Sequence, residues 1–292
     1  ADPKNDKKFA SKKAIEKWLP ADVYVGGAEH IVLHLLYSRF FTKVLQKYGF
    51  VDFNEPFQKL RHQGMILAEN GVKMSKSKGN VINPDNVVSE YGADILRMYE
   101  MFMGPLEDAK PWNTKGIVGI KRFLEKVWGV GHNLGDKKNG ELERLLHKTI
   151  KKVTEDIEDF KFNTAISRLM IFSNKAAEKG KISEKIWGKF LLLLSPFAPH
   201  IAEELWEQLG NKKSIFLEKW PDFDEKLIHE KVCRLVIQIN GKVRDVMEIE
   251  AGISEKEIEN LALSRDKIKK WLDGKNPKKV IYIPERLVNL VI

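Results

Sequence analysis

The sequence contains a single cysteine, Cys233, and this scarcity excludes two kinds of stabilisation. A lone thiol cannot form a disulfide within the chain, and it cannot supply the Cys-x-x-Cys pairs of a structural zinc site. Cys233 lies between Val232 and Arg234 at the expected start of a strand, so we interpret it as a core residue.

Long apolar runs are also absent. No stretch approaches the roughly 20 residues that a membrane-spanning helix needs, and the polar, lysine-rich start does not resemble a secretory signal peptide. The sequence therefore predicts a cytoplasmic protein that has no membrane partner.

Acidic residues are in the minority, because 41 Asp and Glu face 50 Lys and Arg and leave a net charge of +9. This excess suits a polyanionic partner, although charge alone does not separate RNA from DNA or from an anionic membrane. With 292 residues, of which 43% are hydrophobic, the chain can form two or three domains with cores of their own.

What the sequence does have is a short loop of lysines and hydroxyls, Lys73-Met74-Ser75-Lys76-Ser77, with glycines on both sides. Lysine-rich stretches are usually solvated surface. Here the apolar segment 64–68 before the loop predicts a buried strand, and residues 83–85 after it, Asn-Pro-Asp, predict the start of a helix. A loop between a strand and a helix can hold a triphosphate, and the flanking glycines permit it to close and reopen.

The lysines of this loop fit the chemistry of adenylate formation. When a carboxylate attacks the α-phosphate of ATP, negative charge builds on the departing pyrophosphate, and catalysis is mostly positioning and electrostatic stabilisation. Lysine supplies a movable point charge for it. Lys73 and Lys76 are therefore the candidate catalytic residues, with Lys76 at the β- and γ-phosphates. Ser75 and Ser77 could bind phosphate oxygens or hold the loop's own backbone.

A second motif lies upstream, over residues 24–30, ahead of an apolar helix. Glycines between a strand and a helix let the backbone approach a nucleotide, and an acidic residue just beyond them can accept hydrogen bonds from a ribose. His30 and His34 would share a helix face, but neither the His-Glu-x-x-His order nor a third ligand accompanies them, so we predict no protein-bound metal.

Together these motifs resemble the class I aminoacyl-tRNA synthetases, and residues 26–37 look like the bacterial leucyl enzymes. The resemblance implies that the chain is part of a leucine–tRNA ligase, which uses ATP with Mg²⁺ to activate leucine and transfers it to tRNA(Leu). The residues that the resemblance assigns to ATP are Gly26, Gly27, Glu29, His30, Met65, Ile66, Met74, Ser75, Lys76 and Ser77.

Periodicity and resemblance divide the chain into three parts. Residues 1–112 are α/β in pattern and resemble the carboxyl-terminal half of a class I catalytic domain of the Rossmann type. Residues 113–228 show helical periodicity and predict an anticodon-binding bundle of four or five helices, one of them capped at Asn163. Residues 229–292 predict a small α/β domain with an Asn-Gly hairpin turn at 240–241 and a helix over 254–272.

This last part resembles the carboxyl-terminal domain of bacterial leucyl-tRNA synthetases, which touches the corner of the tRNA. The resemblance covers residues 238–244 and 280–291. Surface lysines are commonly only solvated, but here basic residues are candidate phosphate contacts. These candidates are Lys242, Arg244, Lys278, Lys279 and Arg286.

The sequence departs from the family where it lacks the His-Ile-Gly-His signature, the Thr-rich editing domain and an inserted leucine-specific domain. The resemblance therefore implies a larger partner subunit that carries the amino-terminal catalytic half and the editing domain. The alternatives are a cloned fragment of a continuous enzyme and a non-catalytic tRNA-binding protein; isoleucyl and valyl relatives have a different carboxyl end. We expect an exposed apolar face on residues 1–60, where the missing half would dock.

Overall fold

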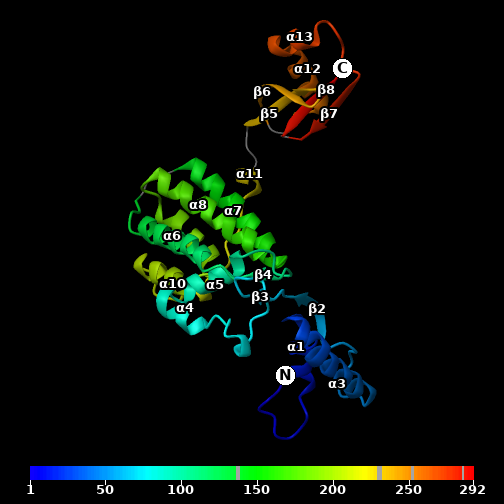
Figure 1. The fold of residues 1–292 in the computed structure, drawn as a ribbon, viewed down its shortest axis with the longest axis vertical. Helices are drawn as coiled ribbons and strands as arrows, with labels where there is room; N and C mark the ends of the chain where they lie inside the picture. The colour runs from blue at the N-terminus through cyan, green and yellow to red at the C-terminus, as the bar shows by residue number, and fades with distance from the viewer. Residues whose placement is uncertain (136–138, 229–231, 251–252, 285) are drawn as a thin grey trace. The chain divides into compact units, whose positions relative to one another are not determined.

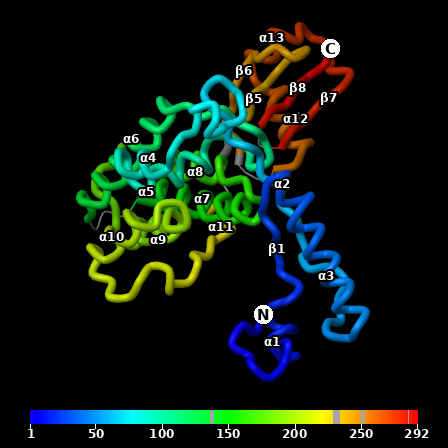
Figure 2. Tube along the Cα trace, turned by 60° about the horizontal axis from the view of Figure 1, so that its bottom comes forward, coloured from blue at the N-terminus to red at the C-terminus, as the bar shows by residue number. Residues whose placement is uncertain are grey.

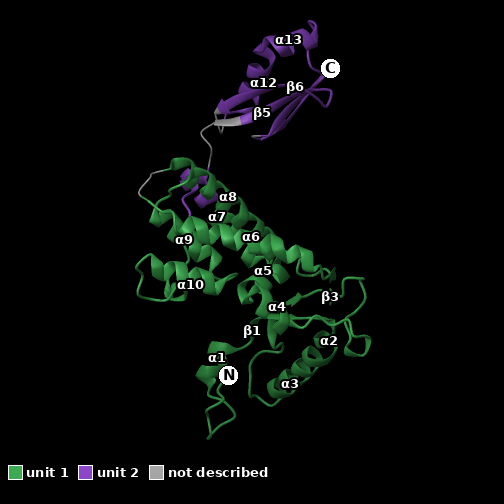
Figure 3. Cartoon of the chain, turned by 60° about the vertical axis from the view of Figure 1, so that its left-hand side comes forward, with its two compact units in different colours: residues 1–142, 149–222 green, residues 143–148, 223–292 purple. Residues whose placement is uncertain are grey.

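The computed structural model describes residues 1–135, 139–228, 232–250, 253–284 and 286–292. They form two compact units (Figure 3): residues 1–142 with 149–222, and residues 143–148 with 223–292. Sheets flanked by helices occur in both units and a helical bundle in the first, so the expected mixture of α/β and all-α structure is confirmed. The domain boundaries at residues 112 and 228 stay predictions. The side chain of Cys233 lies outside the described residues.

The first unit begins with a parallel β-α-β arrangement (Figure 1). Its elements are α1 (Lys12–Trp18), β1 (Ala21–Gly26), α2 (Ala28–His30), the π-helical turn η1 (Ile31–Leu35), α3 (Leu36–Lys47) and β2 (Phe57–His62). Strands β1 and β2 pair in parallel, and Figure 2 follows the chain from α1 through β1 to α3. A parallel pair requires such a crossover, which confirms the predicted α/β pattern of this region.

Much of the apolar surface of this region is open to solvent. On α3 only Thr42 is buried, whereas Phe40 and Phe41 are 63% and 62% exposed. Other exposed apolar side chains of the helical crossover are Val32, Leu33, Leu36 and Tyr37. Clustered apolar residues of this kind mark a contact surface, whereas single ones do not. The exposed apolar face expected on residues 1–60 is therefore confirmed.

A second pair of strands frames the lysine loop. β3 (Ile66–Leu67) pairs in parallel with β4 (Lys110–Pro111), and between them lie η2 (Lys76–Lys78), α4 (Pro84–Tyr91) and α5 (Ala93–Phe102). Helix α4 begins where the sequence predicts, because the side chain of Asn83 accepts a hydrogen bond from the backbone N–H of Asp85. The strand expected over 64–68 is shorter and only partly buried, and Ala68 directly after it is the buried residue of this segment.

Five helices follow in the described residues between 114 and 208, within the predicted four or five. They are α6 (Thr114–Gly131), α7 (Gly140–Glu158), α8 (Phe162–Lys179), α9 (Glu184–Leu194) and α10 (Pro199–Gln208), and the 3-10 turn η3 (Ile215–Leu217) follows them. Buried side chains repeat at helical spacing along them, as at Ile166, Leu169 and Ser173 of α8. The predicted cap at Asn163 is wrong. The cap is Lys161, two residues earlier, because the left-handed Phe160 just after α7 (φ 61°) has already turned the chain.

A buried carboxylate ties α5 to the bundle. Asp94 accepts hydrogen bonds from the backbone N–H of Ile201 at 2.9 Å and of His200 at 3.3 Å, and it lies 2.7 Å from Nδ1 of His200. It therefore caps α10 from another helix, a favourable place for an anion. Three residues further along α5, Arg97 donates to the carbonyl oxygen of Pro196 at 3.0 Å.

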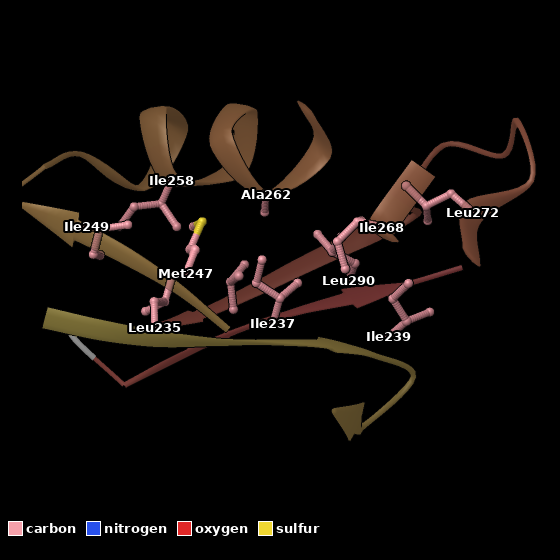
Figure 4. Close-up of a cluster of buried hydrophobic side chains, with 11 residues drawn as sticks. Leu235, Ile237, Ile239, Met247, Ile249, Ile258, Ala262, Ile268, Leu272 and Leu290 are labelled. Carbon is pink, nitrogen blue, oxygen red and sulfur yellow. The ribbon is translucent and has the colours of Figure 1, made fainter. Parts of the chain in front are cut away.

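The second unit contains α11 (Glu225–Ile228) and a four-stranded sheet in the order β6-β5-β8-β7. Its strands are β5 (Val232–Ile239), β6 (Lys242–Glu250), β7 (Lys279–Ile283) and β8 (Leu287–Val291). Asn240 and Gly241 both have positive φ, 47° and 77°, which confirms the hairpin turn. Apolar side chains from one face of the sheet pack against the helices that follow (Figure 4).

The helix expected over 254–272 is two helices, α12 (Glu255–Ser264) and α13 (Asp266–Leu272), separated by the extended residue Arg265. A tertiary contact lies at the break. Arg265 donates a hydrogen bond to the buried carboxylate of Asp245 on β6, and its extended backbone ends α12 and precedes α13.

We expect Asp94→Ala to lower the free energy of unfolding of the first unit by about 2 kcal/mol, because the N–H groups at the start of α10 lose a charged acceptor. Urea unfolding followed by circular dichroism measures it. Asp222→Ala, which removes an exposed carboxylate, is the matched control and should leave the curve unchanged. Identical curves for both variants would contradict the capping role.

The second unit should lose stability in acid through Asp245. A hydrogen bond from Arg265, with Lys267 at 3.4 Å, holds the pKa of this buried carboxyl below its usual value. A lowered folded pKa stabilises the fold above the unfolded pKa, about 3.9, and this stabilisation is lost as the pH falls below it. The free energy of unfolding, measured with urea, should fall less between pH 5 and pH 3 in Asp245→Asn than in the unchanged chain. The exposed Asp266→Asn should behave as the unchanged chain does.

Candidate active site

The lysine loop leaves β3 through a tight turn that returns it beside the strand. The N–H of Gly71 donates to the carbonyl oxygen of Ala68 at 2.8 Å. The N–H of Ala68 donates in turn to the carbonyl oxygen of Val72 at 2.9 Å. Gly71 has a φ of 75°, which glycine adopts without strain. Lys73 then forms an antiparallel bridge with Leu67, so the first lysine of the loop is fixed at the strand.

Asn80, which the sequence analysis missed, fastens the other end of the loop. Its Oδ1 accepts from the N–H of Ser75 at 2.8 Å, and its Nδ2 donates to the carbonyl of Lys73 at 3.3 Å. The hydroxyls of Ser75 and Ser77 lie 2.8 Å apart and bond to each other. Lys76 stands exposed on the 3-10 turn between these serines.

The two predicted motifs meet through an ion pair. Nζ of Lys73 lies 2.8 Å from Oε1 of Glu29, although the residues are 44 positions apart in sequence. Hydrogen bonding from Lys73 lowers the pKa of the Glu29 carboxyl below its ordinary value. Both side chains are more than half exposed, so the pair is accessible to a ligand and contributes little stability.

A cavity of about 750 Å³ opens beside this pair. The structure brings seven of the predicted nucleotide-site residues to its wall, namely Gly27, Glu29, His30, Met65, Ile66, Lys73 and Met74. It does not bring Gly26, Ser75, Lys76 or Ser77 to that wall. The volume lies within the range of small-molecule sites.

Comparison with known proteins finds synthetase families in two parts of the chain. The family described as tRNA synthetases class I (I, L, M and V) matches residues 4–111, and the anticodon-binding domain of tRNA ligase matches residues 139–259. Leucine–tRNA ligases of Borreliella burgdorferi strain ZS7 and Borrelia garinii subsp. bavariensis are 49% identical over the whole chain. The chain belongs to the class I aminoacyl-tRNA synthetases. It corresponds to the carboxyl-terminal part of leucine–tRNA ligases and spans 39% of the length of these relatives.

Solved synthetase structures show the same fold. A ternary complex of leucyl-tRNA synthetase from Agrobacterium radiobacter K84 with tRNA and LeuAMS is 35% identical, with a TM-score of 0.82 over 97% of this chain and 39% of that one. Methionyl-tRNA synthetase of Mycobacterium tuberculosis with methionyl-adenylate is 18% identical, with a TM-score of 0.52 over 69% of this chain and 46% of that one. The likeness to the methionyl enzyme shows a shared fold and nothing more.

Other residues of the synthetase cavity were not found from sequence. His62, Gln63, Glu100, Lys110 and Phe162 come from four separate segments of the chain, and no local motif joins them. Burial raises the pKa of the Glu100 carboxyl and lowers the pKa of the Lys110 ammonium group. The cavity therefore holds ionisable groups in partly desolvated positions, a common property of active sites.

Gly64 is a missed residue that had a sequence signal, because a glycine opens the apolar segment 64–68. A Cβ at this position would lie 1.9 Å from the carbonyl oxygen of Asp108. The N–H of Gly64 donates to the carbonyl oxygen of Leu106 at 2.8 Å, and the N–H of Lys110 donates to the carbonyl oxygen of Met65 at 2.9 Å. A glycine thus permits the two backbones that form the cavity wall to meet.

The two histidines near the first motif have different environments. His30 lines the cavity, whereas Nδ1 of His34 lies 2.9 Å from the Tyr24 hydroxyl. Among the described residues there is no group of three His, Cys, Asp or Glu side chains that could hold a metal ion. Nor does any helix in the described part of the chain have the length and hydropathy to span a membrane.

The basic residues predicted to bind tRNA lie at different edges of the second unit's sheet. Lys242 and Arg244 belong to β6, whereas Lys279 belongs to β7 at the opposite edge, with Lys278 just before it. Arg286 precedes β8. All are exposed except Arg244, which is half-buried and lies against Trp271. Their contacts with tRNA stay predictions.

We expect Gly64→Ala to lower the free energy of unfolding by about 2–3 kcal/mol, because the methyl group must push two hydrogen-bonded backbones apart. Gly119→Ala is the matched control. Nothing lies within 4 Å of a Cβ at Gly119, inside α6, and alanine there should raise stability by up to about 1 kcal/mol. Thermal unfolding of both variants distinguishes the effects, and a stable Gly64→Ala chain would contradict the close approach.

Proposed function

We propose that this chain supplies the lysine loop and the tRNA-binding parts of a leucine–tRNA ligase, which activates leucine with ATP and transfers it to tRNA(Leu). The observation that carries the proposal is the Glu29–Lys73 ion pair beside the cavity. It joins the two motifs in a chain that is 49% identical to leucine–tRNA ligases.

In the proposed reaction, the leucine carboxylate attacks the α-phosphate of ATP, the bond to the bridging oxygen breaks, and pyrophosphate leaves. Glycine at positions 26 and 27 lets the backbone approach the adenosine, and Glu29 accepts hydrogen bonds from its ribose. The backbone at Met65 and Ile66 flanks the adenine. Both lysines of the loop then face the pyrophosphate as its charge grows.

Lys73 and Lys76 have different starting positions in this scheme. Lys73 is held beside the cavity by Glu29, whereas Lys76 stands exposed on the 3-10 turn. Closing of the loop between Gly71 and Gly79, both with positive φ, would bring Lys76 to the β- and γ-phosphates. Mg²⁺ would enter on the phosphate oxygens of ATP, which are the ligands that it prefers.

The rest of the enzyme would cover the apolar face of residues 1–60. Among the described residues of 1–86, only Ile15 and Ala68 are buried apolar residues, whereas the bundle contains many. A larger subunit with the amino-terminal catalytic half and the editing domain would supply this cover, in the cytoplasm. A continuous enzyme of which this chain is a fragment would supply it equally well.

We expect Lys76→Ala to slow leucine-dependent ATP–pyrophosphate exchange by the assembled enzyme on the order of 10²-fold, because one charge that stabilises the departing pyrophosphate is lost. Affinity for tRNA should not change. Lys78→Ala, which removes the other exposed lysine of the same turn, is the control and should change exchange by no more than a few-fold.

Unchanged exchange by Lys76→Ala would refute the assignment of the loop. Binding of tRNA without any leucine-dependent exchange, even in the assembled enzyme, would favour the non-catalytic tRNA-binding protein.

A further inference from the structure

Trp271 lies on the flank of a helix that is anchored to the sheet of the second unit. Ile268 and Leu272 of α13 are buried and point toward the sheet (Figure 4). Trp271 stands one position before Leu272, and it is 51% exposed. A large aromatic residue that serves only the core is normally far more buried, because burial is the source of its stabilisation.

A β-bulge places an arginine against this ring. Strand β6 pairs with β5 through Asp245 opposite Ile237 and then through Val243 opposite Gln238, so Arg244 is the extra residue. Bulges re-aim a side chain, and Cζ of Arg244 lies 3.5 Å from the centroid of the Trp271 ring. At this distance the guanidinium group makes a cation–π contact with one face of the indole.

Arg244 makes no competing hydrogen bond through Nε and no ion pair among the described residues. Its Nε is buried and makes no hydrogen bond in the described structure. Within the described residues its charge is not neutralised either, because the ion pairs of the second unit there involve Arg234, Arg265 and Lys267. The indole is therefore held on one face, while about half of its surface stays open to solvent.

Lysines stand close in sequence to Trp271 and Arg244. Lys269 and Lys270 directly precede Trp271, and Lys242 stands two residues before Arg244. All three are exposed, and none forms an ion pair in the part of the unit that the structure describes. An aromatic face among unpaired lysines complements a polyanion that also carries flat apolar groups, which is the chemistry of single-stranded RNA.

We propose that Trp271, backed by Arg244, is a platform on which an unpaired nucleobase of the tRNA stacks, while Lys269 and Lys270 contact neighbouring phosphates. The inference rests on the proposed tRNA-binding function and adds a residue that contacts a base. Arg244 is a positioning residue, which orients the indole and increases the positive charge behind it. The base is recognised by stacking, so the platform tolerates any of the four bases.

The test measures binding of the purified full chain to a tRNA(Leu) transcript by filter binding at several salt concentrations. Loss of one stacked base corresponds to roughly 1–3 kcal/mol, so Trp271→Ala should raise Kd about tenfold. Trp271→Phe should stay within about threefold, because a ring is retained. Trp18→Ala, which removes an exposed tryptophan that Lys17 covers at 4.9 Å in the first unit, is the matched control and should not change Kd.

Three further readouts separate stacking from charge and from misfolding. The salt slope should be unchanged in Trp271→Ala and smaller by about two in the Lys269→Ala, Lys270→Ala double variant. Arg244→Lys should weaken binding in the unchanged chain and have no further effect in Trp271→Ala, since both act through one platform. Circular dichroism confirms that each variant is folded.

Equal tRNA affinity of Trp271→Ala and the unchanged chain would overturn this inference and leave the proposed function standing. If the unchanged chain binds no tRNA, the proposed function and the platform both fail. If Trp271→Ala keeps its tRNA affinity but no longer associates with the rest of the synthetase, the indole is a protein contact and the platform is refuted.

Discussion

The bond between Asp94 and the start of α10 is the interaction on which the first unit depends. One carboxylate accepts two backbone N–H groups and faces His200, so it satisfies donors that a helix cannot satisfy itself. Helix α5 carries this residue at its beginning and contributes Glu100 to the cavity near its end. The wall of the candidate active site is therefore fixed by the same helix that is fastened to the bundle.

A second constraint acts on the lysine loop, which is held at its ends and left free at its centre. Backbone bonds at Ala68 and the amide of Asn80 fix the approach and the exit, whereas Lys76 remains exposed on a turn that a left-handed Gly79 ends. The Glu29–Lys73 pair is exposed, and such pairs are worth roughly 0–1 kcal/mol. A phosphate can thus displace the carboxylate from Lys73 at little cost. The loop of the free chain is therefore accessible to an incoming substrate.

The sequence predicted those features that depend on neighbouring residues. The Asn-Gly turn at 240–241, the start of α4 at Asn83 and the β-α-β pattern of residues 21–62 are local consequences of residue type. The lysine loop and the glycine motif were found for the same reason. Sequence reasoning failed where contacts between distant segments determine the local structure. Arg265 donates to Asp245, which lies 20 positions away on β6, and the helix expected over 254–272 is divided at this residue.

The cavity residues that sequence reasoning missed also depend on contacts between distant segments. Glu100 and Phe162 reach the cavity only after α5 and α8 have packed, and Gly64 shows its role only when residues 106–110 approach it. Asn80 could have been suspected, since Asn side chains can hydrogen-bond to neighbouring backbone groups in turns. Its two partners, Lys73 and Ser75, are defined only by the folded turn.

Packing would also couple catalysis to folding in the proposed leucine–tRNA ligase. The α/β region contains two separate two-stranded sheets, and a pair of strands is marginal in water unless another layer covers it. Its η1 and α3 leave large apolar side chains such as Val32 and Phe40 exposed, whereas the bundle buries residues such as Trp187 and Phe190 completely. Addition of the remaining catalytic half would complete the nucleotide site and cover these side chains in one step. The lysine loop would then become catalytic only where the sheets beside it are stable, and the proposed binding of tRNA by the free chain would not require activation of leucine.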